Sequence, residues 1–151
     1  MSKIDAKTKI GVFKIEMYDH PSVIREIQIP LKYKLYEFAE SIISSVGWYF
    51  DHAFGFVDDV EEPYSSKIRY ELFHDMGMND GPLETEDVVV KGVKKTNIST
   101  AFPKVGDEML FLFDYGDDHF FHVELVDIKS PEEGTTYPVI KKVKGRSPKQ
   151  Y

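Results

Sequence analysis

The chain contains no cysteine, and this absence excludes several kinds of chemistry at once. Without thiols the protein forms no disulfide, no thiolate metal centre and no cysteine nucleophile. It also has no apolar run near the roughly 20 residues that a transmembrane helix needs. Residues 1–13 lack the apolar core of a signal peptide. The sequence therefore predicts a cytoplasmic protein with no membrane contact.

Several motifs of enzymes and nucleotide-binding proteins are missing as well. The chain has no G-x-G-x-x-G or G-x-x-x-x-G-K loop for phosphates, no G-x-S-x-G elbow for a serine nucleophile and no H-E-x-x-H pair for zinc. Its only arginines are Arg25, Arg69 and Arg146, and no Ser or Tyr nucleophile lies beside a cluster of arginines that could surround a transferred phosphoryl group in strand cleavage. We therefore expect no cofactor and no recombinase activity.

The balance of charge is acidic, with 19 basic against 26 acidic residues and a net charge of −7. Such a charge opposes binding to a phosphate backbone unless the cations are segregated. Residues 137–151 contain no acidic residue and five cations, which are Lys141, Lys142, Lys144, Arg146 and Lys149. This basic tail could contact nucleic acid or an acidic protein, although a solvated terminus is the simpler interpretation.

The clearest pattern in the chain is an apolar stripe with helical spacing. Gly47 follows this stripe and suits the left-handed residue that closes a helix. The stripe consists of Leu35, Phe38, Ala39, Ile42, Ile43 and Val46. Because the period is 3.6 residues, the pattern predicts one amphipathic helix with a buried face.

Alternating apolar residues predict strands elsewhere in the chain. The length of 151 residues suits a single domain over residues 1–151. Two hairpins are predicted, one that pairs residues 10–17 with 23–29 and one that pairs 109–113 with 121–125. Further strands are predicted near 54–56, 64–73, 86–95 and 139–143. A loop is predicted at 74–87 and a helical turn at 98–102. The predicted fold is α+β, with a largely antiparallel sheet built from hairpins and packed against the helix.

The tip of the second hairpin reads "DYGDD", which is Asp114, Tyr115, Gly116, Asp117 and Asp118. Glycine can supply the positive φ of a tight turn, and aspartate side chains accept hydrogen bonds from turn amides. Turn chemistry therefore explains much of this motif.

The same carboxylates could instead bind Mg²⁺, Mn²⁺ or Ca²⁺, with a histidine as nitrogen ligand. Strand alternation places His119 and His122 on opposite faces, so these two should not converge. His52 is a further candidate for base catalysis or metal binding with Asp114 and Asp117. Adjacent residues seldom face each other, so its acid partner should come from the hairpin rather than from Asp51.

The aromatic residues after the helix could form a stacking platform for bases, but a place in the core is the stronger interpretation. These residues are Trp48, Tyr49, Phe50, Phe54 and Phe56. A ligand pocket beside Trp48 remains an alternative.

The order of "VIREIQIP", "LYEFAESII", "GWYFDHAFGF", "FLFDYGDDHFFHVEL" and "YPVIKKVKGRSPKQY" resembles the plasmid pRiA4b ORF-3-like family, which includes proteins described as passengers of an insertion sequence. The resemblance extends from about Ile10 to Tyr151 and implies an α+β domain with a largely antiparallel sheet. Its most specific part is the D-[FY]-G-D turn at residues 114–117.

Three positions depart from the family's pattern. His119 stands where the family usually has Trp, Phe121 where many members have His, and Ile24 where Trp is frequent before Arg25. A function that depended on the family's Trp and His would be lost here, whereas packing could survive the exchange. This pattern favours a structural motif over a catalytic one.

Three hypotheses about function follow. The first is a non-enzymatic domain that acts by protein contact, as an accessory of mobile-element or plasmid biology. The second is a divalent-metal-dependent hydrolase or nucleotide-binding protein that uses the aspartate cluster. The third is DNA binding through the basic tail.

Overall fold

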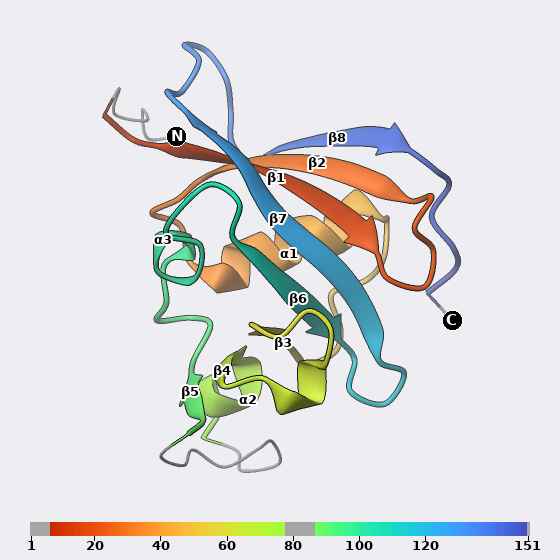
Figure 1. The fold of residues 1–151 in the computed structure, drawn as a ribbon. Coiled ribbons are helices and arrows are strands. Elements are labelled where there is room, and N and C mark those ends of the chain that lie inside the picture. Colours follow the sequence, from red (N-terminus) through yellow and green to blue (C-terminus); the bar gives the residue numbers. More distant parts are fainter. Residues whose placement is uncertain (1–6, 78–86, 151) are drawn as a thin grey trace.

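A computed structural model of the chain describes residues 7–77 and 87–150. Within these residues eight strands form one sheet, in the order β5-β4-β3-β6-β7-β1-β2-β8 (Figure 1). The strands are β1 (Ile10–Met17), β2 (Ile24–Pro30), β3 (Phe54–Val57), β4 (Ile68–Glu71), β5 (Val89–Lys91), β6 (Glu108–Phe113), β7 (His119–Lys129) and β8 (Val139–Lys144). The β4–β5 pair is parallel, and the other neighbouring pairs are antiparallel. The predicted α+β fold with a largely antiparallel sheet is confirmed.

The main helix, α1 (Leu35–Ser45), runs across one face of the sheet (Figure 1). Its buried residues are Ser41 and five of the predicted stripe, whose sixth residue, Val46, caps the helix; the ring of Phe38 packs 4.4 Å from that of Phe13 on β1. Burying one such aromatic side chain contributes about 1.5–3 kcal/mol. No helix in residues 7–77 and 87–150 is long and apolar enough to span a membrane.

The end of α1 has the predicted glycine cap. Gly47 has a φ of 71°, and its N–H donates to the carbonyl of Ser44 at 3.0 Å. The N–H of Trp48 reaches back to the carbonyl of Ile43 at 3.2 Å. This pattern of hydrogen bonds satisfies carbonyls in the last turn and aims the next segment across the end of the helix.

Both predicted hairpins are present. β1 pairs with β2 from Ile10 opposite Pro30 onward, and β6 pairs with β7 up to Phe113 opposite His119. The five residues of the "DYGDD" tip therefore form the whole connection between β6 and β7. The final predicted strand is β8, which pairs with β2.

The middle of the chain differs from the prediction. Residues 64–73 form a short 3₁₀ turn (Pro63–Ser65), then β4, and then the start of α2 (Leu72–Asp75), rather than one strand. The predicted strand at 86–95 is confined to β5, and α3 (Ile98–Ala101) is the predicted helical turn. Most of the loop predicted at 74–87 lies outside the described residues.

Candidate functional site

The turn between β6 and β7 is shaped by Asp114. Its Oδ1 accepts a hydrogen bond from the N–H of Gly116 at 3.0 Å and a weaker one from Asp117 at 3.4 Å. Its carbonyl accepts a bond from the N–H of Asp118 at 2.7 Å, which closes the loop. These bonds are the Asx-type bonds that aspartate makes in turns.

The positive φ angles of this turn lie at Asp114, with 67°, and Asp118, with 51°. Gly116 does not lie in the left-handed region, so the prediction that it supplies the positive φ is wrong. Aspartate is one of the few non-glycine residues that adopt this conformation, because its short side chain can bond to the local backbone. The five-residue loop needs the left-handed residues at its two ends instead of at its centre.

Tyr115 anchors the turn to the neighbouring strands. Its ring lies 5.1 Å from that of Phe73, and its hydroxyl oxygen is 2.8 Å from the position that a Cβ on Gly55 would take. Burial, together with the nearby carboxyl of Glu71, raises the pKa of Tyr115. Burial also raises the pKa of Glu71 itself, and the charge of Arg69 opposes that rise. Tyr115 therefore packs as a neutral side chain.

His52 lies beside the hairpin acids. Its Nε2 is 3.5 Å from Oδ2 of Asp114 and 3.4 Å from Oδ1 of Asp51. The expected partner from the hairpin is thus in reach, but the expectation that Asp51 would face away is wrong. The imidazole packs edge-on against Phe113 at 5.8 Å. His52 therefore links the segment after α1 to the hairpin tip.

A second histidine joins two of the aspartates. Asp114, Asp117 and His119 each offer one ligand atom, and these three atoms lie within 4.8 Å of one another. Nε2 of His119 is buried and has no hydrogen-bond partner in the described part of the chain. His122 lies elsewhere, with its Nε2 2.9 Å from a carboxylate oxygen of Glu108. The histidine that completes this metal-ligand group is therefore His119, and His52 contacts it through Asp114.

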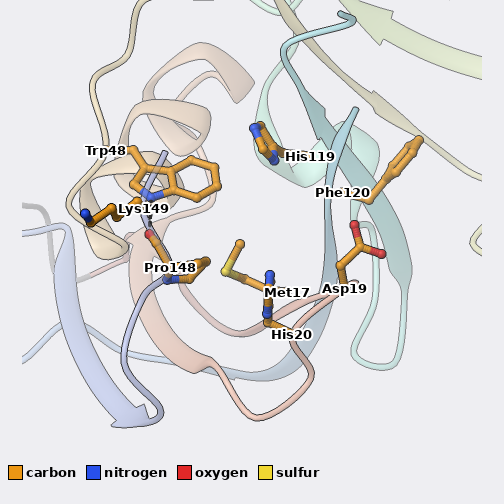
Figure 2. Close-up of a pocket in the computed structure, with 8 residues that line it drawn as sticks. All are labelled: Met17, Asp19, His20, Trp48, His119, Phe120, Pro148 and Lys149. Atoms are coloured by element: carbon orange, nitrogen blue, oxygen red, sulfur yellow. Dashed lines mark hydrogen bonds between the residues drawn. The ribbon is translucent and has the colours of Figure 1, made fainter. Parts of the chain in front are cut away.

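His119 also borders a small pocket (Figure 2). The pocket has a volume of about 60 Å³, and its lining includes Met17, Asp19, His20, Trp48, His119 and Pro148. One edge of Trp48 faces the imidazole of His119, with ring centres 4.7 Å apart. A pocket beside Trp48 was expected, but its lining includes none of Asp114, Asp117, Asp118 and His52. A space of this size holds about two water molecules.

The last described residues lie across the end of α1. The indole N–H of Trp48 donates to the carbonyl of Pro148 at 2.9 Å, as the dashed line in Figure 2 shows. The side-chain amide of Gln150 donates to the carbonyl of Tyr49 at 2.9 Å and accepts from its N–H at 2.8 Å. These bonds attach the segment to the end of α1, while the cations of the basic tail, Lys141, Lys142, Lys144, Arg146 and Lys149, are all exposed. The expectation that Tyr49 belongs to the core is wrong, because its side chain is 76% exposed.

Arg25 holds the same segment from inside, and sequence reasoning missed this role. It is only 3% exposed, and burial lowers its pKa. Its guanidinium donates to the carbonyls of Ser45 and Lys144 and to the hydroxyl of Ser147, each at 2.8 Å. One side chain thus joins β2, the end of α1 and the segment after β8. The sequence signal for it was that Arg25 lies on the same face of the predicted strand as Val23, Ile27 and Ile29.

The fold and the residues of the turn define a class of protein, and comparison with known proteins defines the family. The class is an α+β domain with one sheet, one main helix and an aspartate turn beside a helix-exit tryptophan. A family model described as "Plasmid pRiA4b ORF-3-like protein" matches residues 9–150, so the chain belongs to that family.

A solved structure, "Crystal Structure of Protein of Unknown Function MM3350 from Methanosarcina mazei Go1", has a similar fold. It has 20% sequence identity and a TM-score of 0.65, and the match covers 89% of this chain and 68% of that chain. A comparison with curated proteins gives no match. At this identity the likeness shows the fold alone.

Two departures from the family's pattern can be placed in the structure. Phe121 is fully buried and its ring packs 5.9 Å from Trp48. His119 takes the position that faces the edge of the same indole. The exchange therefore leaves an aromatic contact with Trp48 and puts an imidazole next to the aspartate turn.

Proposed function

We propose that this protein is a non-enzymatic domain that works by binding, and that its hairpin tip holds a divalent metal ion through Asp114, Asp117 and His119. The observation that carries this proposal is the convergence of three ligand atoms within 4.8 Å of one another. Two carboxylates and one imidazole form a mixed oxygen and nitrogen set. Such a set suits Zn²⁺ or Mn²⁺ better than Mg²⁺ or Ca²⁺, which prefer oxygen ligands alone.

The surroundings of the three residues support the proposal. A buried polar atom without a hydrogen-bond partner costs about 1–3 kcal/mol, and Nε2 of His119 is such an atom among the described residues. We propose that this nitrogen is the histidine ligand, so that coordination would remove that cost. Oδ2 of Asp114 faces His52 at 3.5 Å, and contacts of this kind orient ligating carboxylates in metal sites.

The ion would act on the shape of the molecule. Asp114 and Asp117 belong to the turn, whereas His119 opens β7 and contacts Trp48. A cation bound to all three would fix the turn against the start of β7, and the contacts of His119 with Trp48 and of Asp114 with His52 would extend this effect to the segment that follows α1. Binding would therefore stabilise the folded protein in proportion to the logarithm of metal concentration.

Isothermal titration calorimetry with Zn²⁺, Mn²⁺ and Mg²⁺ tests the proposal. The informative variant is Asp117→Asn, because the Asp117 carboxylate makes no hydrogen bond or ion pair within residues 7–77 and 87–150. The variant removes one ligand charge and leaves the turn bonds of Asp114 in place. Asp127→Asn, at an exposed position on β7, makes the same change of charge away from the site.

We expect one ion to bind per chain, with Mg²⁺ the weakest of the three. Asp117→Asn should weaken binding about tenfold or more, as the loss of a ligand or its partner does in other metal sites, and Asp127→Asn should bind as the natural protein does. The proposal is wrong if no metal releases or absorbs heat, or if Asp117→Asn binds Zn²⁺ unchanged.

The nucleotide-binding alternative has less support. The pocket beside Trp48 has about 60 Å³, whereas pockets for ligands of drug or nucleotide size hold about 300–1,000 Å³. An accessory role in mobile-element or plasmid biology stays a prediction from the family resemblance.

A further inference from the structure

We propose that the outer edge of β8 binds an extended acidic segment of a partner protein, which joins the sheet as an additional strand. This surface is separate from the aspartate turn. β8 is the last strand of the sheet and pairs with β2 on one side, and within the described residues no strand pairs with its other side (Figure 1). The backbone N–H and C=O groups along that side form a template for a further strand.

The strand is held in place before any partner arrives. Arg25 donates to the carbonyl of Lys144 at the end of β8 and to Ser147 just beyond it. The hydrogen bond from Trp48 to Pro148 fixes the chain further along. An edge that is already ordered loses less conformational entropy on binding, and this favours affinity.

β8 presents apolar side chains to an incoming strand. Ile140 is 39% exposed and Val143 is 58% exposed. Ile140 pairs with Ile27 in the regular part of the strand, whereas Val143 lies at the irregularity between the pairs Arg25–Lys142 and Ile24–Lys144. Ile140 lies opposite Ile27 of β2 and hence on the face that α1 covers. An apolar side chain of a partner strand could therefore pack against the exposed part of Ile140 or of Val143.

The charges of β8 select an acidic partner. Lys141 lies 3.6 Å from Glu26, whereas Lys142 and Lys144 have no acidic partner in the described part of the chain. Arg146 and Lys149 follow in a segment without acids. Opposite charges on adjacent strands stabilise the pairing. The same lysines oppose pairing with β8 of a second copy, because like charges would then face each other.

A peptide fits this surface better than a nucleic acid does. The net charge of −7 repels a long phosphate backbone, which extends well beyond one strand. A short acidic segment meets only β8 and its neighbours. It can also pair its own amides with the strand edge, which a nucleic acid cannot do in register.

The test uses a fluorescent peptide of alternating Glu and Val, about eight residues long so that it spans the six residues of β8. Fluorescence anisotropy measures its binding to the whole protein. A second peptide of equal charge carries proline at the valine positions, which removes half of the backbone donors and disfavours strand pairing. A fluorescent DNA duplex is the third probe.

The variant Lys142→Glu with Lys144→Glu should weaken binding of the Glu-Val peptide about tenfold or more. The control Lys95→Glu with Lys104→Glu changes the net charge equally at two exposed sites away from β8, and should bind within about twofold of the natural protein. The proline peptide should bind about tenfold more weakly than the Glu-Val peptide.

Three results would overturn the proposal. The first is no binding of the Glu-Val peptide at low salt. The second is equal binding of the proline peptide, which would mean that the surface binds acidic peptides by charge alone, without strand pairing. The third is tighter binding of DNA than of the Glu-Val peptide, with loss of DNA binding in the Lys142→Glu, Lys144→Glu variant.

Discussion

Replacement of Asp114 by alanine should destabilise the protein by about 2 kcal/mol. Asp114 Oδ1 accepts the N–H of Gly116 at 3.0 Å, and its backbone has a φ of 67°. Loss of the hydrogen bond costs about 1 kcal/mol, and alanine in the left-handed region costs about a further 1 kcal/mol. For a chain of this length the sum corresponds to a fall in melting temperature of about 4–8 °C.

Two further replacements at Asp114 separate the contributions. Asparagine keeps both the acceptor and the tolerance of positive φ, so Asp114→Asn should stay within about 0.5 kcal/mol of the natural protein. Glycine removes the acceptor and relieves the backbone, so Asp114→Gly should lose about 1 kcal/mol. Urea denaturation in EDTA measures all three without any contribution from metal. Equal stabilities for the alanine and asparagine variants would refute this account of the turn.

The Asp114 series also distinguishes the turn from the proposed metal site. Asp114→Asn keeps the turn but removes a ligand charge, so it should lose affinity for Zn²⁺ while keeping its melting temperature in EDTA. If Asp114→Asn binds Zn²⁺ as the natural protein does, Asp114 is a turn former alone.

Three other perturbations test the core around the site. Because burial raises the pKa of Glu71 above its ordinary 4.5, the folded state holds this proton more tightly than the unfolded state. The neutral carboxyl therefore contributes stability at a pH below 4.5, the ordinary pKa of the unfolded chain. This contribution is lost as the pH rises through the raised pKa of the folded protein. Urea midpoints across this range should fall more steeply for the natural protein than for Glu71→Gln, and parallel curves would contradict the assignment. Gly55→Ala should cost about 1–3 kcal/mol, because its Cβ would lie 2.8 Å from the hydroxyl oxygen of Tyr115; an unchanged urea midpoint would disprove this close contact. Trp48→Phe removes the hydrogen bond to Pro148 and should cost about 1 kcal/mol, with faster proteolysis within residues 145–150; cleavage at the natural rate would show that this bond does not hold the segment.

The elements that the sequence predicted correctly are those in which buried apolar residues recur at the spacing of a helix or a strand. The stripe from Leu35 to Val46 and the alternation of Phe111, Phe113 and Phe121 record directly which side faces the core. The elements that it missed or made too long are short. α2 has four residues, little more than one helical turn, and β5 has only three of the ten residues predicted as a strand, so long-range packing decides their extent.

The candidate site was predictable in its residues but not in its geometry. The motif identified Asp114, Asp117 and His52, and their contact through Asp114 was anticipated. The position of His119 depends on two left-handed residues in the turn, which no local pattern specified. The hydrogen bond from Arg25 to Ser147 joins the two ends of the fold, and no periodicity in a sequence records such a pairing.

The position of β1 between β2 and β7 has a consequence for synthesis in the cell. β2 leaves the ribosome directly after β1, but Lys129, which pairs with Ile10, emerges only after residues 31–128 have been made. Until then the apolar faces of Phe13 and Ile27 lack part of their cover, and a ribosome makes about 5–20 residues per second. The nascent chain therefore exposes the apolar surface of an incomplete sheet for several seconds. A chaperone that shields nascent chains should bind it during that interval and release it once residues 139–150 have emerged.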